Sequence, residues 1–149
     1  MNKINRKLEY ALMALKHMSK KIPGELTTAK EVSDAFHTPF DATARVMQQM
    51  AQKGGFLRAE YGVNGGYQIT KDLAKVSMQD LVDVIEGPTA LVKCLNNEAP
   101  CEIKGTCNIV SPITQLNNRL TEFYKSLSLK DLLVDKNTIA KKTTEALNG

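Results

Sequence analysis

Two short helical segments joined by a tight turn, directly followed by a glycine-rich hairpin, constrain the fold of this chain more than any other feature. Thr27 or Thr28 is suited to cap the first segment, which continues to Phe36. The second runs from about Pro39 to Lys53 and stops at a pair of glycines. This arrangement is typical of a helix-turn-helix, and a hairpin placed directly after it is a wing.

The two short segments carry further local signals. Glu31 follows Thr28 by three residues, which predicts a reciprocal capping box. Val32, Ala35 and Phe36 are expected to face inward. The second segment has its own apolar face, made by Val46, Met47 and Met50 with Ala42 or Thr43 one turn earlier.

The opposite face of the second segment is polar, with Asp41, Arg45, Gln48 and Gln52 at spacings of three and four. In a helix-turn-helix this helix lies in the major groove of DNA and its N-terminal residues reach base edges. Arginine pairs with guanine, glutamine with adenine, and aspartate accepts from cytosine. Taken alone, the stripe is better explained as the solvated face of an ordinary surface helix than as a DNA-reading face.

The hairpin spans residues 56–70, with β-type segments around Leu57 and Tyr67 and a turn rich in glycine and asparagine between them. Arg58 and Tyr61 lie where a wing reaches the phosphate backbone or the minor groove. The candidate DNA-contacting residues are Thr38, Asp41, Arg45, Gln48, Arg58 and Tyr61.

Charge supports a polyanionic partner for the first half of the chain. Residues 1–75 hold 12 Lys and Arg against 7 Asp and Glu, a net +5, whereas residues 76–149 hold 8 against 9, a net −1. No apolar run approaches the roughly 18 residues of a membrane-spanning helix, and the N-terminal residues lead into an amphipathic segment, not a signal-peptide core. We therefore expect a cytoplasmic protein with no membrane partner, whose thiols stay reduced.

All the cysteines of the chain, Cys94, Cys101 and Cys107, lie in one short loop. An odd number cannot form a closed disulfide framework. Clustered thiolates suit a soft metal ion or an iron–sulfur cluster. Two alternatives remain at this point. The cysteines could form a reactive redox pair with one spare thiol, or all three could have no functional role.

Three more helices are expected. Residues 5–20 form an amphipathic first helix with Glu9 in its first turn, where a carboxylate also suits the helix dipole. A capping sequence at Ser77–Asp80 opens another, which Gly87 and Pro88 end. The last begins at Ser111 and has a heptad seam made by Ile113, Leu116, Leu120, Phe123 and Leu127. This seam favours a homodimer interface over a core-facing helix.

Taken in order, these features resemble the IscR/NsrR family of bacterial winged-helix regulators. The residues that carry the resemblance are Tyr10-Ala11-Leu12, Asn64-Gly65-Gly66-Tyr67, Asp83-Val84-Ile85-Glu86-Gly87-Pro88, the three cysteines and Leu127-Ser128-Leu129-Lys130-Asp131-Leu132. The match covers residues 1 to about 134. It departs at the wing, where many members place an arginine at the position of Tyr61.

The resemblance implies a homodimeric transcription factor on palindromic double-stranded DNA, controlled by an iron–sulfur cluster on Cys94, Cys101 and Cys107. A 4Fe–4S cluster is favoured and 2Fe–2S is the alternative. IscR-like members take a histidine where this chain has Val110, whereas NsrR-like members take a carboxylate from the first helix of the other protomer. Glu9 matches that carboxylate, and His37 is the runner-up for the fourth ligand.

The sequence therefore predicts a mainly α fold with a small β wing, a winged helix-turn-helix domain and a long C-terminal dimerisation helix. The predicted divisions are the DNA-binding domain 1–88, the cysteine loop 89–110, the dimerisation helix 111–134 and a polar tail 135–149. The predicted function is a regulator whose cluster senses nitric oxide or redox stress. The alternative is a regulator that uses its cysteines as zinc ligands or a thiol switch.

An enzyme or electron carrier that uses a cluster with an open iron is the third possibility. Against it, the sequence shows no nucleophile paired with a base and no ferredoxin-type cysteine run. We therefore expect no catalytic activity and no small-molecule substrate.

Overall fold

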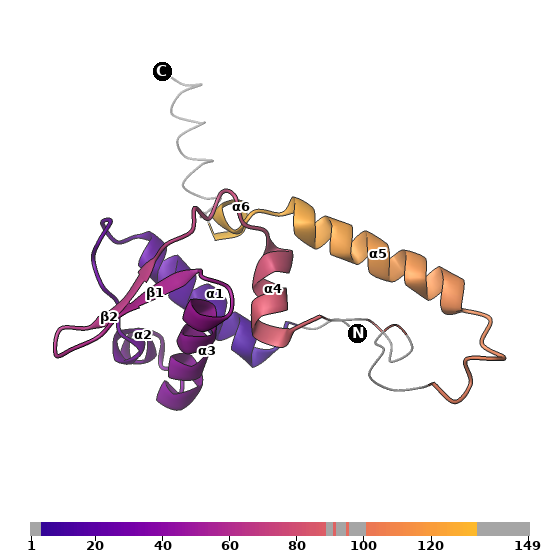
Figure 1. Cartoon of the computed structure of the whole chain (residues 1–149), viewed down its shortest axis with the longest axis horizontal. Helices are drawn as coiled ribbons and strands as arrows, with labels where there is room; N and C mark the ends of the chain where they lie inside the picture. The colour runs from indigo at the N-terminus through magenta and orange to yellow at the C-terminus, as the bar shows by residue number, and fades with distance from the viewer. Residues whose placement is uncertain (1–3, 89–90, 92–94, 96–100, 134–149) are drawn as a thin grey trace, which may run out of the picture.

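The computed structural model describes residues 4–88, 91, 95 and 101–133. Cys94 and the tail 135–149 lie outside the described residues, as does much of the rest of the cysteine loop. The elements are α1 (Arg6–Ser19), α2 (Ala29–Phe36), α3 (Phe40–Gln52), β1 (Leu57–Glu60), β2 (Gly66–Ile69), α4 (Met78–Glu86), α5 (Val110–Ser126) and α6 (Leu129–Leu133). Figure 1 shows α1 to α4 and the hairpin gathered together, with α5 projecting away from them.

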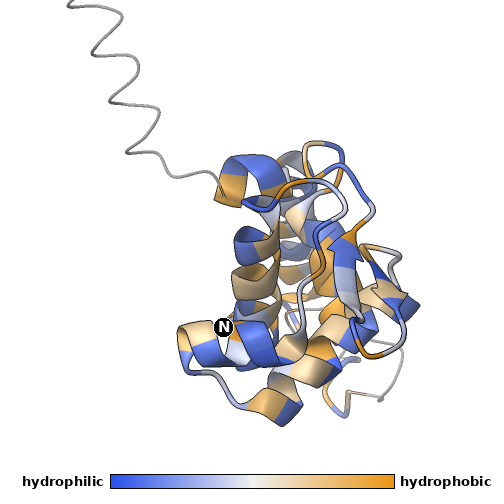
Figure 2. Ribbon diagram, turned by 90° about the vertical axis from the view of Figure 1, so that its left-hand side faces the viewer, coloured by the Kyte–Doolittle hydropathy of each residue, from blue (hydrophilic) through white to orange (hydrophobic). Residues whose placement is uncertain are grey.

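Helix α1 forms the base on which the other helices of the domain pack. Asn5 caps it, because its side-chain oxygen accepts a 2.9 Å hydrogen bond from the Leu8 N–H. Its buried face repeats at helical spacing and consists of Leu8, Ala11, Ala14, Leu15 and Met18. The small alanines let α3 and α4 approach closely. Figure 2 shows hydrophobic and hydrophilic residues alternating along the helices, as amphipathic packing requires.

The helix-turn-helix forms as predicted, with three differences. Thr28 is the N-cap of α2, but the Glu31 side chain does not complete the capping box. Ala35 and Phe36 are both exposed at the end of α2, so the expectation that they face inward is wrong, whereas Val32 is buried as expected. Helix α3 begins at Phe40, one residue later than predicted, with Pro39 at its N-cap and no side-chain cap hydrogen bond.

The wing is a two-stranded antiparallel hairpin in which Leu57 pairs with Ile69 and Glu60 with Gly66. Its turn needs glycine at two places. Gly62 has a φ of +115°, which disfavours other residues, and a Cβ at Gly65 would collide with the Glu60 carbonyl oxygen.

The hairpin also pairs with the segment before α2. The backbone of Tyr67 in β2 exchanges hydrogen bonds of 2.9 and 2.8 Å with the backbone of Thr27. These bonds fix the wing to the helix-turn-helix.

Helix α4 has the predicted capping box between Ser77 and Asp80. The predicted last helix is interrupted. Helix α5 ends at Ser126, the backbone of Leu127 is extended, and the chain then forms α6. The Met78 N–H donates to the Leu127 carbonyl at 2.8 Å, and Leu129 is fully buried in the core of the winged domain. Leu127 packs partly against the same core.

The predicted fold class is confirmed: the described chain is mainly helical with one small hairpin, in a winged-helix arrangement. Within the described residues, no helix combines the length and apolar character that crossing a membrane requires.

Candidate DNA-binding face and cysteine loop

The polar stripe predicted for α3 is exposed. Asp41, Arg45 and Gln48 all face solvent. The other side of α3 is buried and consists of Thr43, Val46, Met47 and Met50. The core therefore fixes the rotation of α3 about its axis, and this rotation presents the three polar side chains together on the outside of the domain.

Thr38 has a different environment from the other candidate DNA contacts. It is half-buried, and its hydroxyl oxygen lies 2.7 Å from the Thr43 hydroxyl oxygen. Thr43 donates its single hydroxyl proton to the Pro39 carbonyl at 2.9 Å, so Thr38 is the donor to Thr43. The Thr38 hydroxyl can therefore only accept a hydrogen bond from outside the chain.

The two candidate residues of the wing are both exposed. The Arg58 Nε lies 3.1 Å from Glu60 Oε1, so a neighbouring carboxylate already neutralises its charge in part. Tyr61 is 94% exposed at the end of the hairpin and is free to contact a partner.

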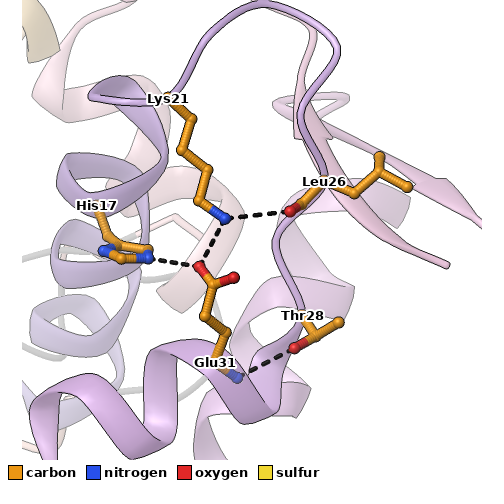
Figure 3. Close-up of polar contacts among 5 residues, drawn as sticks. All are labelled: His17, Lys21, Leu26, Thr28 and Glu31. Atoms are coloured by element: carbon orange, nitrogen blue, oxygen red, sulfur yellow. Dashed lines mark hydrogen bonds and ion pairs between the residues drawn. The ribbon is translucent and has the colours of Figure 1, made fainter. Parts of the chain in front are cut away.

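An ion-pair network that sequence reasoning missed joins α1 to α2. Figure 3 shows His17 and Lys21 pointing from α1 and the segment after it towards Glu31 on α2. The His17 Nε2 and the Lys21 Nζ each lie 2.6 Å from Glu31 Oε2. Lys21 also donates to the Leu26 carbonyl at 3.1 Å. Glu31 is therefore turned away from the Thr28 backbone, which explains the incomplete capping box.

The pKa of Glu31 reflects this network. Burial raises it, but hydrogen bonds from Lys21 and then His17, together with their positive charge, lower the pKa below its usual value of 4.5. The ionised carboxylate therefore stabilises the contact between α1 and α2, and through it the position of the helix-turn-helix.

The cysteine loop is described in part. Cys101 and Cys107 are both free and half-buried, and Cys94 lies outside the described residues. Two consecutive turns separate the described pair, closed by hydrogen bonds from the Lys104 N–H to the Cys101 carbonyl and from the Thr106 N–H to the Ile103 carbonyl. Across the described ranges, no three His, Cys, Asp or Glu side chains gather as a metal site.

The two candidate fourth ligands occupy different parts of the domain. Glu9 lies in the first turns of α1, where its carboxylate pairs with Arg6 at 2.9 Å. Helix α1 packs against α4, and Figure 1 shows the start of α1 beside the end of α4, from which the cysteine loop departs. His37 lies instead in the turn before α3, exposed and in the left-handed conformation with φ of 54°.

The predicted seam on α5 is only partly covered in the single chain, where α5 contacts α4. Not one residue of α5 is buried, and Leu116 and Phe123 are 47% and 58% exposed. Ile113 and Leu120 are half-buried on the same face. Only Leu127 differs, because it follows the helix and packs on the winged domain of its own chain.

A helix-turn-helix with an exposed polar stripe on its second helix, followed by a β wing, defines a winged-helix DNA-binding protein. The Rrf2 family model, described as an iron-dependent transcriptional regulator, matches residues 4–135. The chain therefore belongs to the Rrf2 family, which includes the regulators that the sequence resembled, and that prediction is confirmed. It is a DNA-binding transcription regulator and not an enzyme, as predicted.

Individual relatives agree with this assignment. An rrf2-like HTH-type transcriptional regulator of Rhodobacter capsulatus is 27% identical over 93% of this chain and 97% of its own length. The HTH-type transcriptional regulator NsrR of Bacillus subtilis is 21% identical over 93% of this chain and 95% of its own. The solved structure of CymR, the global cysteine regulator of B. subtilis, has a TM-score of 0.68 at 22% identity and covers 91% of this chain and 100% of CymR.

The Glu31 network predicts a pH-dependent contribution to stability. Glu31→Gln should lower the free energy of unfolding at pH 7 by about 0.2–1 kcal/mol, since the carboxylate is partly exposed. A carboxylate with a lowered pKa contributes stability above the unfolded-state value and loses it as pH falls through the folded-state value. The difference between wild type and variant, measured by urea unfolding at fixed protein concentration, should therefore shrink as the pH falls below 4.5.

Asp34→Asn provides the matched control, because it makes the same change on α2 in an exposed pair with Lys30. Its effect should be smaller. If the two variants lose equal stability at pH 7, or if the loss in Glu31→Gln stays constant as the pH falls below 4.5, the network does not stabilise the domain.

Proposed function

We propose that this protein is a cytoplasmic homodimeric regulator that binds a palindromic operator and responds to nitric oxide or redox stress through an iron–sulfur cluster. The observation that carries the proposal is the exposed polar face of α3, in a chain that also has three clustered cysteines and a partly exposed apolar seam on α5. A selection from random duplex DNA with the purified protein, with and without its cluster, tests the proposal directly. Failure to enrich any sequence in either form would refute it.

Operator reading rests on α3. Asp41, Arg45 and Gln48 lie on one exposed face, and each can form hydrogen bonds to base edges in the major groove. The wing supplies Tyr61 and Arg58 for the DNA backbone, with Arg58 weakened by its contact to Glu60. Thr38 helps to position this face through its hydrogen bond to the Thr43 hydroxyl on the buried side of α3.

Arg45→Ala should reduce operator affinity by about 1–3 kcal/mol, because a bidentate contact to guanine would be lost. The loss should be confined to operator DNA with the guanine at that position. Fluorescence anisotropy over a series of salt concentrations measures both the affinity and its salt dependence.

Lys75→Ala is the control for charge alone, since Lys75 is exposed and lies between Leu73 and Val76, whose carbonyls accept hydrogen bonds from the backbone of α6. Helix α6 lies at the other end of the domain from α3 (Figure 1). The variant should bind operator as the wild type does. Equal losses in the two variants, on operator and random DNA alike, would argue against base reading by Arg45.

Dimerisation through α5 would bury the seam. A helix with no buried residue in its own chain and with apolar side chains along one stripe is suited to pair with a second copy. In such a dimer a two-fold axis would relate the two α3 helices, which matches the symmetry of a palindromic operator. We include Ile113, Leu116, Leu120 and Phe123 in this interface.

Leu120→Asp should produce monomers that no longer bind a two-half-site operator, because each protomer would bury an unpaired charge at the centre of the seam. Multi-angle light scattering reports the mass, and gel shift the binding. Asn118→Asp adds the same acid to the exposed opposite side of α5 and should remain dimeric. A wild-type protein that is already monomeric at micromolar concentration would end the dimer proposal.

Cys94, Cys101 and Cys107 would hold the cluster, with 4Fe–4S favoured over 2Fe–2S. The donor set fits: thiolates are the usual protein ligands of iron–sulfur clusters, and the two described cysteines are free and only half-buried. When bound, the cluster supplies iron that reacts with nitric oxide or oxidants. Glu9 would complete the ligand set across the dimer, so that ligation connects one protomer's winged domain to its partner's cysteine loop.

The alternative function keeps the DNA-binding module and replaces the cluster with direct thiol chemistry. The similarity to CymR, a cysteine regulator, favours it. Free, half-buried thiols are also suited to a thiol switch or to zinc. Anaerobic purification followed by absorption and resonance Raman spectroscopy separates the two, since only a cluster absorbs near 400 nm.

Glu9→Ala should leave the protein folded and dimeric, because a partly exposed carboxylate in the first turn contributes only about 0.3–1 kcal/mol. It should nevertheless change the absorption and Raman spectra of the anaerobically purified protein and its rate of reaction with nitric oxide. Arg6→Ala is the control: it removes the same ion pair and keeps the carboxylate. Spectra and rates that are unchanged in Glu9→Ala would leave Glu9 as a helix-start carboxylate only.

A further inference from the structure

Phe40 is the first residue of α3 and is 52% exposed. In the described part of the chain, its ring takes part in none of the aromatic contacts and it is not among the residues that pack on the core. Phe36, four residues earlier, differs because its ring packs edge-on against His17 at 5.4 Å. Phe36 therefore contributes to the α1–α2 contact, whereas Phe40 is available to a partner.

The position of Phe40, more than its exposure, identifies that partner. Single exposed apolar side chains are common on protein surfaces and need no explanation. Phe40, however, lies at the N-terminal end of the helix that enters the major groove, where side chains reach base edges. It directly precedes Asp41, and Ala44, one turn later, is too small to cover the ring.

A phenyl ring has no hydrogen-bonding group, so it cannot read the donors and acceptors of a base pair. It can recognise the C5-methyl group of thymine, the one apolar group that a base pair presents in the major groove. We infer that Phe40 is a specificity residue of the operator-reading face, which selects a thymine in each half-site by burying its methyl group. This inference rests on the proposed function, because it requires α3 to read duplex DNA.

Phe40 provides a kind of base selectivity that the polar stripe of α3 lacks. Asp41, Arg45 and Gln48 discriminate by hydrogen bonds to cytosine, guanine and adenine, and none of them distinguishes thymine from uracil. Phe40 supplies the apolar contact at the margin of the same face.

Deoxyuridine tests the contact, since it differs from thymidine only in lacking the methyl group. An operator is first obtained by selection with the wild-type protein. Each thymine of one half-site is then replaced singly by deoxyuridine, and dissociation constants are measured by anisotropy. At one position, the replacement should weaken wild-type binding about fourfold, as expected for the loss of one buried methyl group. The same replacement in both half-sites should weaken binding about fifteenfold.

Phe40→Ala should bind the thymine operator more weakly and lose all discrimination at that position. It should still discriminate against replacement of the guanine that Arg45 reads, which shows that α3 remains docked. Phe40→Leu keeps an apolar side chain and should retain part of the discrimination. Ile22→Ala removes an exposed apolar side chain after α1, outside the helix-turn-helix, and should behave as the wild type.

The inference is overturned if wild-type protein ignores every deoxyuridine, or if Phe40→Ala discriminates as the wild type does. Both results are compatible with specific operator binding, so they would leave the proposed function standing. A selection that enriches no sequence would overturn the proposed function and this inference together.

Discussion

A short series of hydrogen bonds across the turn between α2 and α3 sets the geometry on which the DNA-binding face depends. The Ser33 hydroxyl donates to the Thr38 carbonyl at 2.6 Å, and the Thr38 N–H donates to the Ser33 carbonyl at 3.2 Å. Thr38 then bonds to Thr43 on α3. Because Ser33 and Thr43 are buried, these bonds are shielded from competing water. The direction in which α3 leaves α2 is therefore fixed locally, before any contact with DNA.

Packing then fixes the remaining freedom of α3, its rotation about its own axis. Met47 and Met50 are fully buried against α1, which presents alanines there and so allows close approach. Met fills irregular space without a strict shape requirement. The Glu31 network holds α2 to α1 from the other side. The reading face is thus a consequence of core packing, and its polar residues make little contribution to the fold.

Most of this fold could be predicted from sequence because its signals are local. Apolar spacing, capping residues and glycines located the helices and the wing, and the buried set of α3 was predicted correctly. What failed depended on contacts between distant residues. Glu31 satisfies the local capping-box pattern, yet Lys21 and His17 compete for its carboxylate.

The candidate site was predicted to a similar extent. The polar stripe of α3 is visible in the sequence as a periodic pattern. Phe40 was not predicted as part of the DNA-binding face, because an aromatic residue next to a predicted helix start is expected to be buried in the core. Only the structure shows that it is exposed. Likewise, the heptad pattern continues through Leu127, and only the hydrogen bond from Met78 reveals that the helix has ended there.

That interruption between α5 and α6 has a mechanical consequence. The extended residues between the two helices pair with the start of α4, through the Ser77–Ser128 bridge and the bond from Met78 to Leu127. Leu129 follows at once and is buried in the core of the winged domain. Helix α5 is therefore attached to this core by several backbone hydrogen bonds and a buried side chain, and not by a flexible linker.

Helix α4 connects that attachment to the cysteine loop. Its N-terminal end bonds to the segment that follows α5, and its C-terminal end leads into the loop that contains Cys101 and Cys107. It also packs against α1 and α3 along its length. A change of arrangement at the loop would act on α4 and, through the same packed core, on the orientation of α3. Within the described residues, packed contacts thus run without a break from α4, which precedes the cysteine loop in the chain, to α3.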